Sequence, residues 1–242
     1  MKKIIAFVLV MILLPGCIKV KKSSSKENEE FRADSLRQVE ALIQDSIKQE
    51  ELYRSFTSPD LEMFNLHGHV QSVTYTSEMF FPSFYGGLKS SINFDTEGRC
   101  TNIKDLFQKS VGENGNVQVS RNEKNQIIEL NLPNLDYPFE YKFGWSDGHL
   151  ISCENSVWES YSDMKIFYEN DVPESVSEKG GVEGMEFESN ATYSNFVYDE
   201  MGNWISCDYK FTTKSWDFDS PYDVETQHFN ETIKRKITYY PR

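Results

Sequence analysis

The fold is decided by stretches such as Phe196-Val197-Tyr198-Asp199-Glu200-Met201-Gly202-Asn203-Trp204-Ile205, in which β-branched and aromatic residues stand on both sides of a short polar segment. Residues of these two kinds favour β-strands. Glycine and asparagine accept the positive φ angle that a tight turn requires. The stretch therefore predicts a β-hairpin that reverses direction at Gly202.

The same pattern occurs four more times, with turn centres at Gly98, Asn125, Gly148 and Asp171. At Gly98, for example, strand-like residues 91–94 lead into the turn and residues 99–103 lead out of it. Hairpins that recur at intervals of roughly 20 to 30 residues bury their apolar faces against one another. Residues 233–240 alternate in the same way and would add a last strand. We therefore predict a mainly β fold, in which residues 58–242 form an antiparallel sheet of hairpin repeats.

Two of the five units resemble the YD repeat of Rhs-type proteins: Phe94-Asp95-Thr96-Glu97-Gly98-Arg99 and Tyr198-Asp199-Glu200-Met201-Gly202-Asn203. Both keep an aromatic residue, the aspartate that follows it, and a glycine after two further residues. The resemblance implies β-hairpin repeats in an extracytoplasmic protein. Residues 66–70 and 236–240 also look like parts of uncharacterised bacterial lipoproteins with such repeats, and this resemblance implies no activity.

The N-terminus has the features of an export signal. Met1-Lys2-Lys3 is basic, residues 4–14 are apolar, and the small residue Gly16 precedes Cys17. The apolar run is too short for a membrane-spanning helix, which needs about 20 residues. The end of the segment, Leu14-Pro15-Gly16-Cys17, resembles the lipobox of bacterial lipoproteins. The resemblance implies that residues 1–16 are a signal peptide and that acyl chains on Cys17 anchor the protein to a membrane.

The segment between the anchor and the sheet has two parts. Residues 17–30 are polar and have too few large apolar side chains to fold, so we predict a tether. Residues 31–57 carry apolar side chains mostly at three- and four-residue steps, which predicts one amphipathic helix. Ser58-Pro59 would end this helix.

The chain is acidic, with a formal net charge of -13, and loss of the lysines in residues 1–16 would make it more acidic. An acidic surface repels nucleic acids, so we predict no nucleic-acid partner for the β domain. The sequence contains no phosphate-binding loop and no Gly-x-Ser-x-Gly motif, and we predict no cofactor.

Three cysteines lie beyond the anchor, namely Cys100, Cys153 and Cys207. Cys153 and Cys207 occupy equivalent positions after the turn glycines Gly148 and Gly202, which makes them the candidate disulfide pair. The alternative at each position is a buried, reduced cysteine that acts as a small hydrophobic residue.

Two further groups of residues are candidates for binding. Trp145, Trp204 and Trp216 could stack on a sugar or a protein partner, although packing within the sheet explains them equally well. Asp217, Asp219 and Asp223 place three carboxylates in one short segment and are a weak calcium candidate. That segment lacks the glycine and distal glutamate of an EF-hand loop, and a solvated acidic loop is the favoured interpretation.

We expect a membrane-anchored envelope lipoprotein that serves as a non-enzymatic binding or scaffold module for a protein or glycan partner. The expected location is the outer membrane facing the periplasm, with surface exposure as an alternative. One alternative function is an extracytoplasmic hydrolase that acts on envelope or dietary polymers. Another is a structural or immunity component of a secretion or toxin system, which the YD resemblance suggests.

Overall fold

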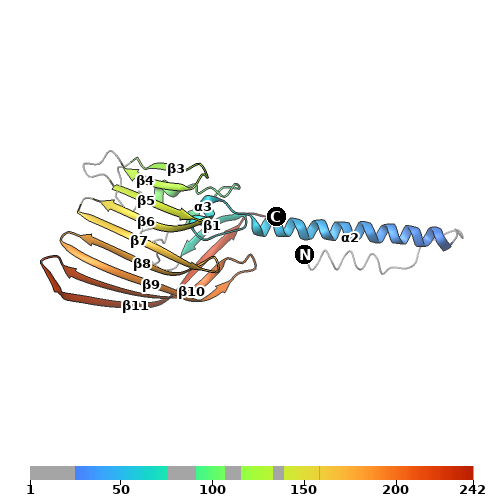
Figure 1. Cartoon of the computed structure of the whole chain (residues 1–242). Helices are drawn as coiled ribbons and strands as arrows, with labels where there is room; N and C mark the ends of the chain where they lie inside the picture. The colour runs from blue at the N-terminus through green and yellow to red at the C-terminus, as the bar shows by residue number, and fades with distance from the viewer. Residues whose placement is uncertain (1–24, 76–90, 107–115, 133–138, 158, 242) are drawn as a thin grey trace. The chain divides into compact units, whose positions relative to one another are not determined.

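The computed structural model describes residues 25–75, 91–106, 116–132, 139–157 and 159–241 (Figure 1). The predicted signal peptide and Cys17 lie outside the described residues, as does most of the predicted tether. The chain divides into two compact units, Met1–Glu50 and Glu51–Arg242.

The described part of the first unit is helical. Helix α2 (Ser25–Ser55) starts inside the segment expected to be a tether, ends near the predicted boundary, and continues into the second unit. Its apolar side chains within the first unit are largely exposed, as at Leu36, Leu42, Ile43 and Ile47. None of the described helices is long and apolar enough to cross a membrane.

The second unit is built on one antiparallel sheet of eleven strands, in the order β2-β1-β11-β10-β9-β8-β7-β6-β5-β4-β3 (Figure 1). Strands β3 to β11 follow each other as a meander, and β1 and β2 extend the sheet beyond β11. The result confirms the predicted mainly β fold of antiparallel hairpins. The strands are β1 (Val70–Tyr75), β2 (Ile92–Asn93), β3 (Gln118–Arg121), β4 (Ile127–Leu132), β5 (Phe139–Ser146), β6 (His149–Val157), β7 (Ser160–Glu169), β8 (Val172–Val182), β9 (Met185–Tyr198), β10 (Trp204–Asp217) and β11 (Ser220–Tyr239).

All five predicted turn centres have positive φ angles. The angles are 74° at Gly98, 62° at Asn125, 84° at Gly148, 64° at Asp171 and 87° at Gly202. Only glycine, and to a lesser extent asparagine and aspartate, adopts this left-handed backbone readily. The residue types at the turns are therefore the local cause of the strand reversals.

Three of these turns share one hydrogen-bond arrangement. It explains why an aspartate stands at the same position in both copies of the YD-like motif. The Oδ1 atom of Asp199 accepts hydrogen bonds from the backbone N–H groups of Met201 (2.9 Å) and Asn203 (3.0 Å). Asp95 accepts from the second and fourth residues after it in the same way, and so does Asn122. In each case the side chain stands in for a backbone acceptor and fixes the turn.

Within the β domain, two differences from the sequence prediction concern residues 99–103 and the hairpin between β8 and β9. The prediction of a return strand over 99–103 was wrong, because only an isolated bridge joins Phe94 to Cys100 and residues 103–106 are helical. An additional hairpin, which the sequence pattern did not reveal, reverses at Glu183-Gly184 between β8 and β9.

One face of the sheet forms the core. Along β7, Ser162, Met164 and Ile166 are buried, and the residues between them are exposed. This period of two is the pleat of a half-buried strand. The short helix α3 (Pro59–Met63) adds Leu61 and Met63 to the same core.

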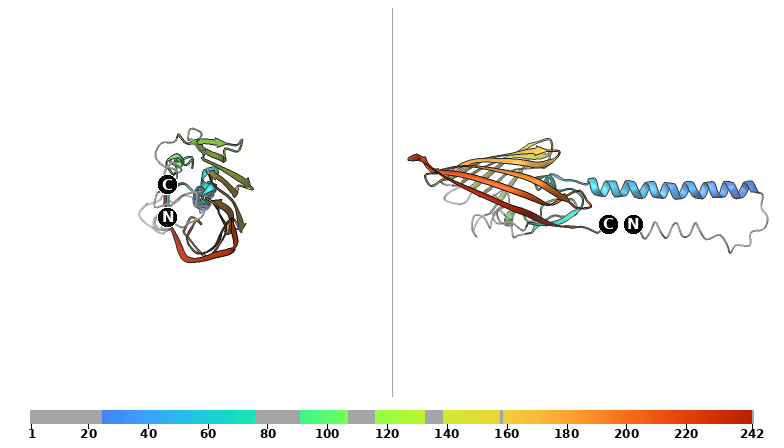
Figure 2. Two further views of the ribbon diagram at one scale, coloured as in Figure 1. Left: turned by 90° about the vertical axis from the view of Figure 1, so that its left-hand side faces the viewer. Right: turned by 90° about the horizontal axis from the view of Figure 1, so that it is seen from below.

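The sheet is curved, and Figure 2 shows its strands following an arc around α3. Asp60 of α3, with 2% of its surface exposed, accepts a hydrogen bond from the backbone N–H of Cys100 (2.8 Å). It also forms an ion pair with Arg121 of β3 (2.6 Å). Cys100 bridges to Phe94, which directly follows β2. Since β2 and β3 are the two edge strands, one carboxylate holds both edges of the sheet to α3.

Candidate functional site

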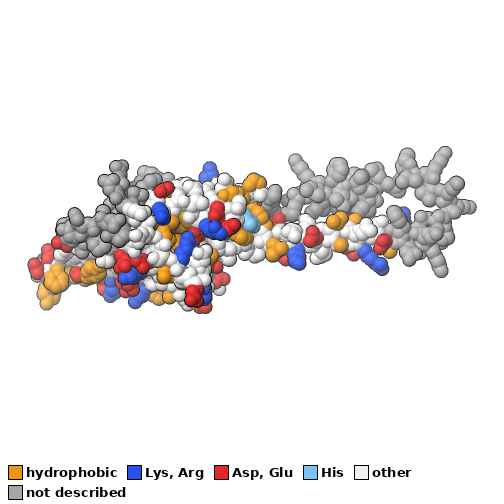
Figure 3. Space-filling view, turned by 90° about the horizontal axis from the view of Figure 1, so that it is seen from above, with side chains coloured by type: hydrophobic (Ala, Val, Ile, Leu, Met, Phe, Trp, Pro, Cys, Tyr) orange, Lys and Arg blue, Asp and Glu red, His pale blue; other side chains and the backbone are white. Residues whose placement is uncertain are grey.

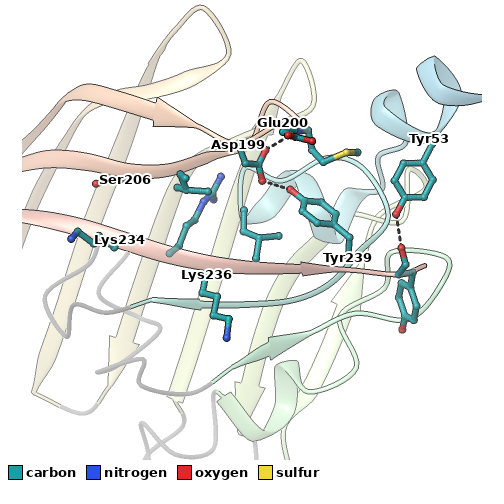
Figure 4. Close-up of a pocket in the computed structure, with 12 residues that line it drawn as sticks. Tyr53, Asp199, Glu200, Ser206, Lys234, Lys236 and Tyr239 are labelled. Carbon is teal, nitrogen blue, oxygen red and sulfur yellow. Dashed lines mark hydrogen bonds between the residues drawn. The ribbon is translucent and has the colours of Figure 1, made fainter. Parts of the chain in front are cut away.

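A groove opens where β11 changes partners. Strand β11 pairs with β10 as far as Lys234, and from Arg235 onward it pairs with β1 instead. The two strands therefore diverge, and a cavity of about 800 Å³ lies between them (Figure 4). We call it the strand-split groove. Its lining residues are Tyr53, Asp199, Glu200, Met201, Ile205, Ser206, Lys234, Arg235, Lys236, Ile237, Tyr239 and Tyr240.

Arg235 is fully engaged within the protein. Its guanidinium donates to the carbonyl oxygens of Trp204, Phe64 (3.1 Å) and Asn65 (3.0 Å), and it stacks 3.7 Å from the centre of the Trp204 ring. Burial lowers the pKa of Arg235, and nearby Tyr75 opposes this shift. The residue thus joins β11 to β10 and to the end of α3, and its charge is not directed at a ligand.

Two tyrosines give the groove rigid walls. The hydroxyl of Tyr239 donates to Asp199 and accepts from the side-chain amide of Asn203 (2.8 Å). Burial raises the pKa of Tyr239, and the hydrogen bond to Asp199 adds to the shift. The hydroxyl of Tyr53, in the last turn of α2, donates to the backbone oxygen of Tyr240 (2.6 Å). Because these hydroxyls are bonded, the rings are held in place.

Charged groups of opposite sign lie on opposite walls of the groove. Lys234 and Lys236 are exposed because they alternate with the buried residues Ile233 and Arg235 along β11. Figure 4 shows both lysines on the β11 side, with Glu200 on the β9–β10 turn across from them. The groove therefore combines apolar and aromatic surface with a charged rim, as ligand-binding clefts do.

Asp199 is a structural residue of the groove. One of its carboxylate oxygens accepts from two backbone N–H groups of its own turn, and the other accepts from Tyr239. Asp95 and Asn122 play the same part in their own turns. A carboxylate with both oxygens engaged is poorly placed to act as a general base toward a ligand.

The three tryptophans that were candidates for binding lie in different environments. Trp204 is 3% exposed and lies under Arg235, so the alternative of packing within the protein holds at this position and binding at the surface does not. Trp145 is half-buried, and its indole N–H donates to the Ile127 carbonyl (2.8 Å). Trp216 is half-buried on β10 and pairs across the sheet with Glu186 of β9.

The predicted disulfide between Cys153 and Cys207 was wrong. Both cysteines are free and buried, as is Cys100. Cys153 belongs to β6 and Cys207 to β10, with three strands between them. At roughly 4.8 Å per strand the two positions lie about 19 Å apart along the sheet, whereas bonded cysteines have Cα atoms within about 7 Å. Cys153 and Cys207, at equivalent positions after a turn glycine, therefore both face the core but lie too far apart to bond.

The weak calcium candidate does not form a site. Asp217 ends β10, Asp219 lies in the following turn, and Asp223 belongs to β11. The backbone N–H of Asp219 donates to Asp217 (2.8 Å), which makes a local turn. Over the described part of the chain, no group of three or more His, Cys, Asp or Glu side chains is arranged to hold a metal ion.

The turn between β10 and β11 carries exposed aromatic side chains. Phe218 is 70% exposed and Tyr222 is 95% exposed. The backbone N–H of Phe218 donates to the Gly184 carbonyl (2.8 Å), which joins this turn to the neighbouring hairpin. Figure 3 shows hydrophobic side chains beside acidic ones at the end of the sheet where these hairpins turn. Sequence reasoning missed these aromatics because it considered only the aspartates of the same segment.

Two carboxylates outside the groove have raised pKa values. Burial raises the pKa of Glu178, which lies on the inner face of β8, and a hydrogen bond with Ser162 opposes the shift. Burial also raises the pKa of Glu62, and the nearby His149 opposes the shift. A raised carboxyl pKa is a feature of general acids, so Glu178 and Glu62 are the candidates for a hydrolytic activity.

Sequence reasoning found some residues of the groove but not the groove itself. Asp199 belongs to a predicted turn, and the alternation over 233–240 places Lys234 and Lys236 on one face. No local signal shows that β11 leaves β10 at this point. Comparison with known protein families, curated proteins and solved structures finds no match to the chain.

Proposed function

We propose that this chain is a lipid-anchored lipoprotein of the cell envelope whose β domain binds a protein or glycan partner in the strand-split groove. The observation that carries the proposal is the groove itself, where β10 and β11 separate around an apolar, tyrosine-walled surface with lysines on one rim. The exposed aromatics Phe218 and Tyr222 are a second surface of the kind that binding proteins present.

The groove favours binding over catalysis. Its one partly enclosed carboxylate, Asp199, is engaged on both oxygens, and its buried cation, Arg235, is bonded to backbone carbonyls. The hydrolase alternative would instead use Glu178 or Glu62, neither of which lines the groove. Their raised pKa values are the observation that favours this alternative.

Site-specific photo-crosslinking tests the groove. We would place p-benzoylphenylalanine at Lys236 in the intact lipoprotein in its own cells, with the same substitution at exposed Lys165 on β7 as the control. A protein partner gives a discrete crosslinked band from position 236 alone, and a glycan array identifies a sugar ligand. Equal crosslinking at both positions, with no glycan bound, would contradict the proposal.

Cell fractionation tests the anchor. Cys17→Ser removes the thiol that would carry the acyl chain, and we expect the variant to leave the membrane fraction or to remain unprocessed. A Cys17→Ser protein that partitions with membranes as the wild type does would refute lipidation at this residue. Protease treatment of intact cells then distinguishes a periplasmic domain, which survives, from a surface-exposed one, which is degraded.

A further inference from the structure

We propose that the ligand of the strand-split groove is an extended polypeptide segment of another protein, which adds as a strand to the free edge of β11 and places a carboxylate opposite Lys236. This inference rests on the proposed function and names its partner. The argument depends on the strand edge, on the length of the gap and on Lys236.

The first step concerns the edge of β11. Between Arg235 and Tyr239 this strand is paired with β1 on one side, and its pairing with β10 ends at Lys234. In an antiparallel ladder, the N–H and C=O groups of successive residues point alternately to the two sides of the strand. Alternate residues of this segment therefore direct their backbone groups toward the groove, where no strand among the described residues pairs with them.

The second step concerns size. The five residues from Arg235 to Tyr239 span about 16 Å at roughly 3.3 Å per residue. A guest segment of about five extended residues matches this length. A cavity of about 800 Å³ is within the range of about 300–1,000 Å³ that encloses ligands. Strand addition is an established way for an exposed edge to bind a peptide, with main-chain hydrogen bonds for affinity and alternate side chains for specificity.

The third step is charge complementarity. Lys236 lies within the unpaired segment of β11 and its side chain is exposed, so a paired guest strand would place one side chain directly opposite it. Lys236 makes no ion pair with any other described residue. Opposite charges across a strand pair are favourable, whereas like charges are not. The guest therefore needs Asp or Glu opposite Lys236, with apolar residues on either side of it.

A second copy of the chain does not meet this requirement. The described edge strands are β2, with the sequence Ile92-Asn93, and β3, with the sequence Gln118-Val119-Ser120-Arg121. Neither carries a carboxylate, and β3 ends in an arginine that is paired with Asp60. A glycan fits less well because the Tyr53 and Tyr239 hydroxyls are already bonded within the protein.

The test uses a phage-displayed library of random linear decapeptides, selected against the full-length lipoprotein extracted in detergent. We expect the enriched peptides to carry an acidic residue flanked by apolar ones. Affinity should fall at least tenfold for Lys236→Glu and remain unchanged for Lys165→Glu, which lies on the outer face of β7. N-methylation of alternate peptide nitrogens should abolish binding, and N-methylation of the intervening ones should not, because only one set faces β11.

Three results would overturn the inference. They are enrichment of peptides without an acidic residue, binding that is insensitive to N-methylation at every position, and no enrichment at all. If no peptide binds while position 236 still crosslinks a partner or a glycan binds, the strand model fails and the proposed function stands. If neither peptide, protein nor glycan engages the groove, both fail.

Discussion

At the scale of single residues, Arg235 joins three segments that are distant in the sequence. Its planar guanidinium reaches the carbonyls of Trp204, Phe64 and Asn65 at once. A lysine ammonium cannot reproduce this fork. We expect Arg235→Lys to lower the free energy of unfolding by about 2–4 kcal/mol, since each buried carbonyl that loses its donor costs about 1–3 kcal/mol.

Urea unfolding followed by tryptophan fluorescence measures this loss. The matched control is Lys236→Arg, the reverse exchange at the adjacent exposed position, which should change the free energy of unfolding by less than about 0.5 kcal/mol. Equal stability of the two variants would mean that Arg235 does not hold the strands together at the groove.

At the scale of elements, the turn at Gly98 meets two requirements. The backbone of Gly98 is left-handed, and the turn packs against α3. Gly98 has φ 74°, and a Cβ placed there would lie 2.7 Å from the Ser58 hydroxyl and 3.0 Å from Leu61. Gly184 has φ 86° with nothing within 4 Å of such a Cβ. Gly184→Ala should therefore cost only the left-handed strain of about 1–2 kcal/mol. Gly98→Ala should cost at least about 1 kcal/mol more, because its methyl group also overpacks the core.

Thermal or chemical unfolding of the two variants gives the comparison directly. Both substitutions carry the same backbone strain, so the difference between them reports the contact of the turn with α3. A Gly184→Ala variant as unstable as Gly98→Ala would show that this contact contributes nothing to stability.

The turns were predictable because their cause is local. Asp199 and Gly202, and likewise Asp95 and Gly98, supply an acceptor and a left-handed residue within five positions. The hairpin at Glu183-Gly184 was not found, because Gly180 and Gly181 precede it and glycine is a poor strand residue. Contacts across the sheet compensate for this: a Cβ at Gly180 would lie 2.6 Å from the ring of Phe187 on β9.

At the scale of the whole molecule, the features that sequence reasoning missed are long-range. Asp60 joins both edges of the curved sheet to α3, because it bonds to Cys100 and to Arg121. The groove depends on β11 exchanging β10 for β1, whose Tyr75 pairs with Arg235. Neither relationship has a signal in the local pattern of apolar and polar residues, since both join segments far apart in the chain. The same holds for Cys153 and Cys207, whose equivalent positions in two hairpins did not make them neighbours.

The three buried thiols make the stability of the whole domain depend on alkaline pH. Burial raises the pKa of Cys100 to about 12 and that of Cys207 to about 12, and it raises the pKa of Cys153 well above its ordinary value. Below about pH 8.5 the thiols are protonated in both the folded and the unfolded chain, so they add no pH dependence. Above that pH the unfolded chain loses these protons, while the folded chain keeps them because burial raises the pKa of each thiol. The free energy of unfolding should therefore fall by about 1.4 kcal/mol per pH unit for each thiol.

The measurement is the slope of the free energy of unfolding between pH 9 and 10, roughly below the range in which ordinary tyrosines titrate. We expect Cys207→Ala to reduce this slope by about 1.4 kcal/mol per pH unit, the contribution of one thiol, whatever its effect on stability at neutral pH. Because the described cysteines are free, a reductant should leave the melting temperature unchanged, and thiol reagents should label all three only after unfolding. An undiminished slope in Cys207→Ala, or rapid labelling of the folded protein, would mean that these thiols are not enclosed in a single core that spans the curved sheet.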